Sequence, residues 1–184
     1  MAMSARNPRK PRPPIGAEKL DELALSYVGR FATSRAKLLT YLKRKLRERG
    51  WTGEGEPPLD ELANRLVRLG YVDDRAYALS KARSLTGRGY GERRVRQALS
   101  LAGIAEEEAG DARELAEAEA VESALRFAKR RSLGPFAAER PDPRRREREM
   151  AAMIRAGHGF GLVRAIIDLN PGEIPDFETL SKLR

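Results

Sequence analysis

Apolar side chains recur three or four positions apart along most of this chain, which is the spacing of one face of an α-helix. The clearest stripes are Leu38, Leu42 and Leu46; Val95, Ala98 and Leu99; and Leu162, Val163, Ile166 and Ile167. Runs that alternate apolar and polar residues, as strands require, do not stand out. The pattern therefore predicts an all-α protein.

Three segments follow one plan, in which a basic amphipathic helix is followed by a glycine and then by an aromatic, apolar or histidine residue. They end at Gly50-Trp51, Gly103-Ile104 and Gly157-His158, so that their glycines lie 53 and 54 residues apart. This interval is near the upper end of the periods found in stacked helical units. The recurrence predicts a modular helical array with a positive stripe on each module.

Glycines, prolines and changes in charge divide the chain further. Residues 1–16 are basic and proline-rich without an acid, which predicts a disordered arm that either touches phosphates or only solubilises the chain. We expect helical repeats at residues 17–70, 71–110 and 111–169, followed by a weakly patterned tail at residues 170–184.

Several local signals place the ends of the helices. Ser34 and Asp73 are good N-caps, and Gly50 is a natural C-terminal stop. The glycines at positions 87, 89 and 91 suggest a flexible loop before the second basic helix. The sequence after Asp111 predicts one long helix, with acids early and bases late. Its inward residues would be Leu115, Ala118, Val121, Leu125 and Ala128.

Composition limits the kinds of partner and the cellular compartments that fit this protein. The net charge of +9 favours a polyanion, whether nucleic acid, an anionic membrane surface or an acidic protein face. There is no cysteine, which excludes disulfides and thiolate metal sites and fits a reducing compartment. The sequence contains no apolar run near the roughly 18 residues of a membrane span, and no secretory signal core. We expect a soluble cytoplasmic protein without membrane contact.

Residues with catalytic potential are few. The single histidine, His158, stands between glycines in a predicted turn, which favours a structural role. The chain has no phosphate-binding P-loop pattern. Asp73 and Asp74 together suggest a metal-dependent nuclease, but adjacent carboxylates at a helix start are more often caps. We therefore expect no enzyme activity, no metal and no cofactor.

The basic helices are the positive signal, because three such runs occupy matching points of successive units. Arginine dominates them, and its planar fork suits phosphate and carboxylate alike. Phe31, Tyr41 and Trp51 are expected to pack between helices, which argues against sequence-specific reading of single strands. The candidate binding residues are Arg30, Arg35, Lys37, Arg44, Arg83, Arg88, Arg93, Arg94, Arg96, Lys129, Arg130 and Arg131.

Over about residues 20–169 the sequence resembles the RecX family of bacterial regulators of the RecA recombinase. The resemblance is strongest from Leu69 through Gly70-Tyr71-Val72-Asp73-Asp74 to Ala78. It continues through Gly89-Tyr90-Gly91, Arg94, Leu99 and Gly103-Ile104, and it includes Ala24 to Tyr27 with Arg30 and Ser34-Arg35. The third unit departs from the family, since Gly157-His158-Gly159-Phe160 stands where Arg-Gly-Phe is usual.

The resemblance implies tandem three-helix repeats in an elongated, curved array. It implies a monomer that lies in the groove of the RecA–single-stranded-DNA filament. There the protein would modulate ATPase and strand exchange, usually by inhibition, without chemistry of its own. The alternatives are a basic helical DNA-binding protein that acts without a recombinase and, third, a metal-dependent nuclease.

Overall fold

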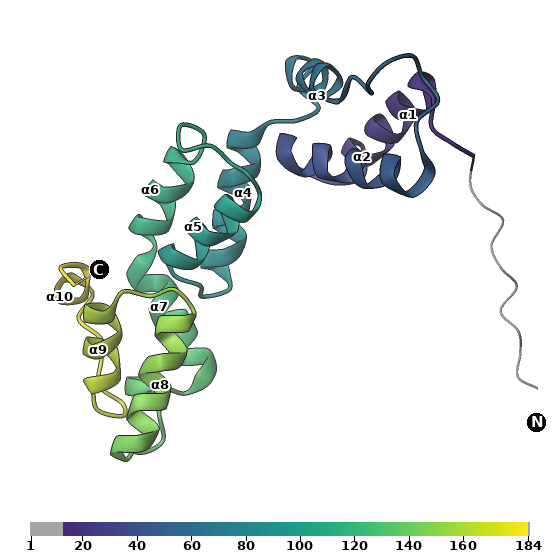
Figure 1. The fold of residues 1–184 in the computed structure, drawn as a ribbon. Helices are drawn as coiled ribbons and strands as arrows, with labels where there is room; N and C mark the ends of the chain where they lie inside the picture. The colour runs from purple at the N-terminus through teal and green to yellow at the C-terminus, as the bar shows by residue number, and fades with distance from the viewer. Residues whose placement is uncertain (1–12, 184) are drawn as a thin grey trace, which may run out of the picture. The chain divides into compact units, whose positions relative to one another are not determined.

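The structure is a computed structural model that describes residues 13–183. This part of the chain holds ten α-helices, one short 3₁₀ helix and no strand beyond an isolated bridge (Figure 1). The prediction of an all-α protein built from helical units is confirmed. The chain forms two compact units, which we call unit 1 (Met1–Val72) and unit 2 (Asp73–Arg184).

Unit 1 is a bundle of α1 (Ala17–Val28), α2 (Arg35–Arg49) and α3 (Leu59–Arg68). Its core is formed mainly by leucines, namely Leu20, Leu38, Leu42, Leu59, Leu62 and Leu66, which include Leu38 and Leu42 of the predicted stripe. Ser34 caps α2 as expected, because its hydroxyl accepts a hydrogen bond from the Lys37 amide at 3.2 Å. Tyr41 stacks on Tyr27 with ring centroids 4.1 Å apart, and Trp51 packs against the core, as expected. The Phe31 ring also lies 5.6 Å from that of Tyr27, but it remains 57% exposed.

The segment before α1 is tied to the end of α2. Ile15 is fully buried, its amide donates to the Gly50 carbonyl at 3.0 Å, and its own carbonyl accepts from Thr52 at 3.0 Å. The Arg49 guanidinium also donates to the Pro13 carbonyl at 2.7 Å. The prediction of a disordered arm through residue 16 is therefore wrong for residues 13–16. The basic residues of that arm lie outside the described part of the chain.

Unit 2 contains two three-helix bundles. The first comprises α4 (Asp74–Gly87), α5 (Glu92–Leu101) and α6 (Gly110–Ala118). Asp73 caps α4 as predicted, since its carboxylate accepts from the Ala76 amide at 2.8 Å. Small residues let α4 and α6 approach closely, and the core consists of Ala78, Ala82, Leu85, Val95, Leu99, Ala109, Ala112 and Ala116.

The second bundle comprises α7 (Ala120–Arg131), α8 (Pro143–Arg155) and α9 (Phe160–Asp168), with a 3₁₀ turn, η1 (Gly134–Phe136), after α7. A final helix, α10 (Phe177–Ser181), packs on α7 and α9. Leu180 of α10 is only 3% exposed and joins the core of this bundle. The segment expected to be a weakly patterned tail thus contributes to the fold.

The prediction of one long helix after Asp111 is wrong. The chain leaves helical geometry at Glu119, where φ is −88° and ψ is 10°, and Ala118 is exposed instead of inward-facing. The α6 helix packs on α4 and α5, whereas α7 packs mainly on α9 and α10. Packing therefore assigns α6 to the first bundle of unit 2, although the sequence placed residues 111–118 in the following repeat.

Backbone contacts join the two bundles of unit 2. The Gly91 amide donates to the Ala156 carbonyl at 3.0 Å, and the Arg93 amide donates to the Gly157 carbonyl at 3.2 Å. A methyl group on Gly91 would place its carbon 2.4 Å from the Gly157 oxygen. Gly89 and Gly91 are buried. The glycine stretch expected to be a flexible loop is instead a close-packed junction.

Candidate functional site

Four exposed arginines form a basic surface on unit 2 around two aromatic rings, of which Tyr90 is half-buried and Phe127 is buried. We call this surface the basic strip, and it consists of Arg88, Tyr90, Arg94, Phe127, Arg130 and Arg131. The guanidinium carbons of Arg88 and Arg94 lie 5.6 and 5.9 Å from the centre of the Tyr90 ring. Those of Arg130 and Arg131 lie 5.5 and 5.3 Å from the centre of the Phe127 ring. A hydrogen bond from Arg130 to the Arg88 carbonyl connects the two groups.

The junction between the bundles places the basic strip. Arg88 follows α4 and Arg94 lies on α5, while Arg130 and Arg131 occupy the last turn of α7, where positive charge suits the helix dipole. Arg126 also links the two bundles, because its guanidinium donates a hydrogen bond to the Thr86 carbonyl at 2.7 Å. The strip therefore crosses from the first bundle of unit 2 to the second.

The positive charge of the basic strip is not neutralised within the described residues. None of its four arginines forms an ion pair with a carboxylate of residues 13–183. Arg88 instead donates to the Ser84 carbonyl at 3.0 Å, and Arg94 donates to the Gln97 side chain at 2.9 Å. Uncompensated guanidiniums beside aromatic rings suit an extended anion such as a phosphate backbone.

The predicted basic residues of unit 1 lie in different settings. Arg35 donates to Asp60 at 2.7 Å and to Asn64 at 2.9 Å, so it holds α2 against α3. Arg44 is exposed, 3.7 Å from Glu48 and over the Tyr41 ring. Arg30 is exposed in the turn after α1, and Lys37 is half-buried near the start of α2. Among these residues, Arg35 has a clear structural use.

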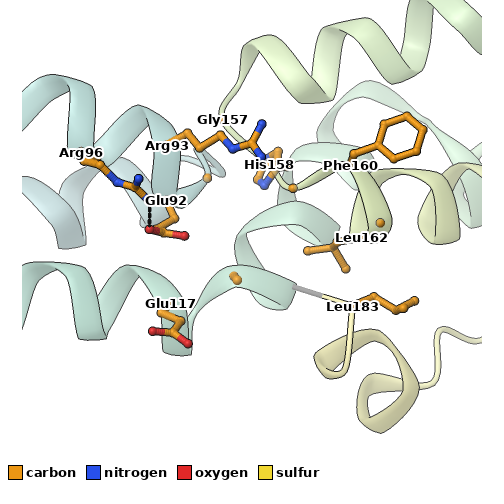
Figure 2. A pocket seen from close by; sticks show the side chains of 13 residues that line it. Glu92, Arg93, Arg96, Glu117, Gly157, His158, Phe160, Leu162 and Leu183 are labelled. Atoms are coloured by element: carbon orange, nitrogen blue, oxygen red, sulfur yellow. Dashed lines mark hydrogen bonds and ion pairs between the residues drawn. The ribbon is translucent and has the colours of Figure 1, made fainter.

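The remaining predicted residues of unit 2 lie outside the basic strip. Arg83 on α4 and Lys129 on α7 are exposed. Arg93 and Arg96 line a separate hollow of about 410 Å³, which also contains His158, Phe160 and Leu183 (Figure 2). Two glutamates, Glu92 and Glu117, line the same hollow, and Glu92 pairs with Arg96. Charge is balanced there, so the hollow has no preference for an anion.

His158 has a structural setting. Its side chain is 2% exposed, and its Nε2 lies 3.1 Å from the Gly89 carbonyl, which requires the Nε2–H tautomer as donor. Burial lowers the pKa of His158 from about 6.5 to about 4, against the opposing effect of this hydrogen bond. The ring is therefore neutral at pH 7 and fastens the junction between the two bundles.

The two carboxylates that suggested a nuclease lie at the start of α4, where Asp73 caps the helix and Asp74 is in its first turn. Elsewhere in this bundle Asp111 pairs with Arg75 at 2.7 Å, a contact that lowers the pKa of Asp111. Across residues 13–183, no three histidine, aspartate or glutamate side chains lie close enough to hold a metal ion. No described helix is both long and apolar enough to cross a membrane.

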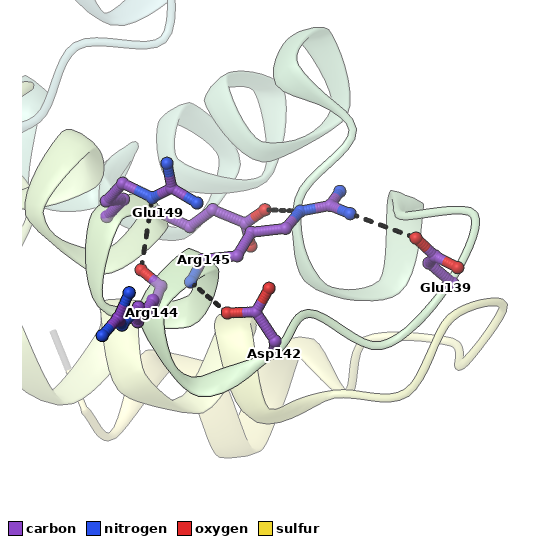
Figure 3. Close-up of polar contacts among 6 residues, drawn as sticks. Glu139, Asp142, Arg144, Arg145 and Glu149 are labelled. Atoms are coloured by element: carbon purple, nitrogen blue, oxygen red, sulfur yellow. Dashed lines mark hydrogen bonds and ion pairs between the residues drawn. The ribbon is translucent and has the colours of Figure 1, made fainter.

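A further group of arginines, not predicted from the sequence, lies between α7 and α8. Arg145, Arg148 and Arg155 line a hollow of about 400 Å³ together with Arg131 and Glu149. Arg145 donates to Glu149 at 2.8 Å and lies 3.5 Å from Glu139, while Asp142 caps the helix (Figure 3). Arg145, Arg148 and Arg155 are three and seven residues apart, so they lie on one face of α8. This spacing is the sequence signal by which the group could have been found.

Fold and surface together define a class: basic, all-helical proteins built from three-helix units. Residues 73–112 match the family model described as RecX, second three-helix domain. A regulatory protein RecX of Myxococcus xanthus is 35% identical over 178 residues, which cover 90% of this chain and 92% of that protein. Another, from Agrobacterium fabrum, is 30% identical over 139 residues, covering 73% of this chain and 74% of that protein. The chain belongs to the RecX family of regulatory proteins.

Solved structures agree on the fold. The crystal structure of RecX from Lactobacillus salivarius superposes with a TM-score of 0.58 at 23% identity, covering 82% of this chain and 94% of that one. A second crystal structure of a regulatory protein RecX gives a TM-score of 0.58 at 22% identity, covering 83% and 71%. The resemblance drawn from the sequence over about residues 20–169 is confirmed by the family-model match and by the two relatives.

Proposed function

We propose that this protein regulates homologous recombination by binding the RecA–single-stranded-DNA filament and inhibiting its ATPase and strand exchange. In this role it acts as a cytoplasmic monomer in DNA repair and the SOS response, by binding and without catalysis. The observation that carries the proposal is the basic strip, whose four arginines lack carboxylate partners within the described residues. Membership of a family of regulatory proteins supports the same role.

The chemistry of the strip supports contact with the DNA backbone in preference to the bases. Tyr90 and Phe127 each have two guanidiniums over their rings. Rings engaged in this way are poor platforms for nucleobases, whereas the guanidiniums keep donors for phosphate oxygens. Binding of this kind is largely independent of sequence, as a regulator of a filament on any DNA requires.

The strip would also suit DNA without a recombinase, so a second candidate is a helical DNA-binding protein that acts alone. A RecA pull-down and the DNA-dependent ATPase of RecA, measured with increasing amounts of this protein, separate the two. We expect capture with the filament and a falling ATPase rate. Binding to naked DNA with no filament capture and no change in ATPase would favour the second candidate.

Two neighbouring arginines provide a matched pair of variants. Arg94 belongs to the basic strip, whereas Arg93 lines the charge-balanced hollow. We expect R94E to weaken filament binding about tenfold, because it reverses a charge within the strip, and R93E to have a smaller effect. Circular dichroism checks that both variants retain helix content. Equal loss in both variants would show that the strip is not the contact surface.

A further inference from the structure

The hollow between α7 and α8 concentrates arginines from both helices. We call it the arginine pocket; its charged lining consists of Arg131, Arg145, Arg148, Arg155 and Glu149. Four positive charges and one negative charge leave a net +3 within a volume of about 400 Å³. Such a concentration of guanidiniums strongly favours a multiply hydrogen-bonding anion.

A buried carboxylate positions one side of the pocket. Glu149 is 9% exposed, and its Oε1 accepts from the Arg145 Nε at 2.8 Å (Figure 3). Its Oε2 is buried without a hydrogen-bond partner within the described residues. Burying a carboxylate oxygen in this way is unfavourable, and the surrounding positive charges offset the cost. Glu149 thus fixes Arg145 and leaves the other three arginines unneutralised.

Those three arginines are available to a ligand. Among residues 13–183, no carboxylate pairs with Arg131, Arg148 or Arg155. Arg148 uses only its Nε, which donates to the Arg144 carbonyl at 3.3 Å. The Arg131 guanidinium lies over the same Phe127 ring as that of Arg130, so the pocket adjoins the end of the basic strip.

We infer that the arginine pocket binds a phosphate group of the single-stranded DNA backbone, at the end of the path that the basic strip provides. This inference deepens the proposed function and rests on it. Phosphate fits the net charge and the forked donors of the lining. Continuity with the basic strip favours a backbone phosphate over a free phosphate ion, because a chain of phosphates can occupy the strip and the pocket together.

The test is the affinity of the full-length protein for a fluorescently labelled oligo-dT, measured by anisotropy at several salt concentrations without recombinase. R155E removes a pocket arginine. R164E makes the same charge change on α9 at an exposed residue that does not line the pocket. We expect R155E to raise the Kd about tenfold and to lower the slope of log Kd against log salt by about 0.7, the value for one single-strand phosphate. R164E should leave that slope unchanged.

A variant with the opposite expected effect on affinity distinguishes a role of Glu149 in the charge of the pocket from a purely structural role. E149Q removes the negative charge of the lining, while its amide oxygen still accepts from Arg145. We expect E149Q to tighten oligo-dT binding about threefold, because an anion then meets one more uncompensated charge. A purely structural Glu149 predicts weaker or unchanged binding. Helicity and thermal unfolding, measured in parallel, confirm that the variants are folded.

Several results would overturn the inference. The inference is wrong if R155E and R164E have equal salt slopes, or if folded E149Q binds oligo-dT more weakly than the wild type. It is also wrong if the wild-type protein does not bind oligo-dT. Binding of inorganic pyrophosphate, measured at constant ionic strength, tests whether the pocket takes a free anion in place of a backbone phosphate. Loss of pyrophosphate binding in R155E with unchanged oligo-dT binding would rule out the backbone. Because recombinase is absent from this assay, a failure here is distinct from a failure of filament binding.

Discussion

His158 is the residue whose chemistry depends most on its surroundings. It is buried between the two bundles of unit 2, with its Nε2 committed to the Gly89 carbonyl and its ring 5.7 Å from that of Phe127. Charging the ring would place a cation in an apolar setting, so burial lowers its pKa to about 4. The same ring that fastens the junction therefore makes it sensitive to acid.

The stability of unit 2 should fall on acidification. Between pH 6.5 and pH 4 the unfolded chain binds a proton at His158 that the folded protein does not, so the free energy of unfolding decreases as pH falls. We expect a loss of about 2 kcal/mol from this residue between pH 7 and pH 5. Urea unfolding of the wild type and of H158Q at both pH values measures it. An equal pH dependence in the two proteins would contradict the assignment.

Sequence reasoning succeeded at residues whose partners are near in the chain. The caps at Ser34 and Asp73 were predictable because each contacts an amide three positions later. Arg35 was expected on a binding face, but its partner Asp60 lies 25 residues away and is invisible to local pattern. His158 contacts Gly89 across 69 residues, so only its structural character was predictable, not its partner.

At the scale of elements, helix packing decides what helix propensity leaves open. Residues 110–131 contain strong helix formers and neither proline nor an internal glycine after Gly110, so propensity predicts a single helix. The chain breaks at Glu119 because Ala112 and Ala116 join the core of one bundle, while Val121, Ala124 and Phe127 join that of the next. A single straight helix could not place these two sets of residues in two separate cores.

The junction between the bundles depends on the absence of a side chain at Gly91. We expect G91A to destabilise unit 2 by about 1–3 kcal/mol, because its methyl carbon would lie 2.4 Å from the Gly157 oxygen. G87A, in α4 with open space around it, should be neutral or stabilising by up to about 1 kcal/mol. Thermal unfolding compares the two variants. Equal stability would show that the junction can move apart without cost.

The C-terminal helix α10 should contribute measurably to the second bundle. Leu180 is 3% exposed in its core, whereas Leu183 is 41% exposed. We expect L180A to lower the free energy of unfolding by about 2–4 kcal/mol, because truncation leaves a cavity. L183A, the same substitution one turn later, should cost less than about 1 kcal/mol. If the two variants unfold alike in urea, α10 does not dock as described.

At the scale of the whole molecule, the main feature is an excess of positive charge. The chain carries a net charge of +9, and the basic strip and the arginine pocket together gather seven arginines. The sequence revealed the charge and the basic helices. It did not reveal which arginines meet, because the pocket forms only where α7 packs against α8. Arg93 and Arg94 are adjacent in sequence yet line different surfaces.

Binding to the recombinase filament should weaken steeply with salt. Each phosphate contact releases about one counterion, so several arginine contacts predict a loss of at least about tenfold in affinity between about 50 and 200 mM salt. Co-sedimentation of the wild type with filaments across this range measures the loss. Binding that does not change with salt would indicate an apolar protein contact in place of the basic surfaces.

The junction at Gly91 and Gly157 also bears on how this protein can be redesigned. Its hydrogen bonds join main-chain atoms, so no choice of neighbouring side chain can make room for a larger residue at either position. Gly157 additionally has a φ of +99°, which side chains rarely tolerate. The arginines around the junction can therefore be varied in redesign, while both glycines must stay if the geometry of unit 2 is to be kept.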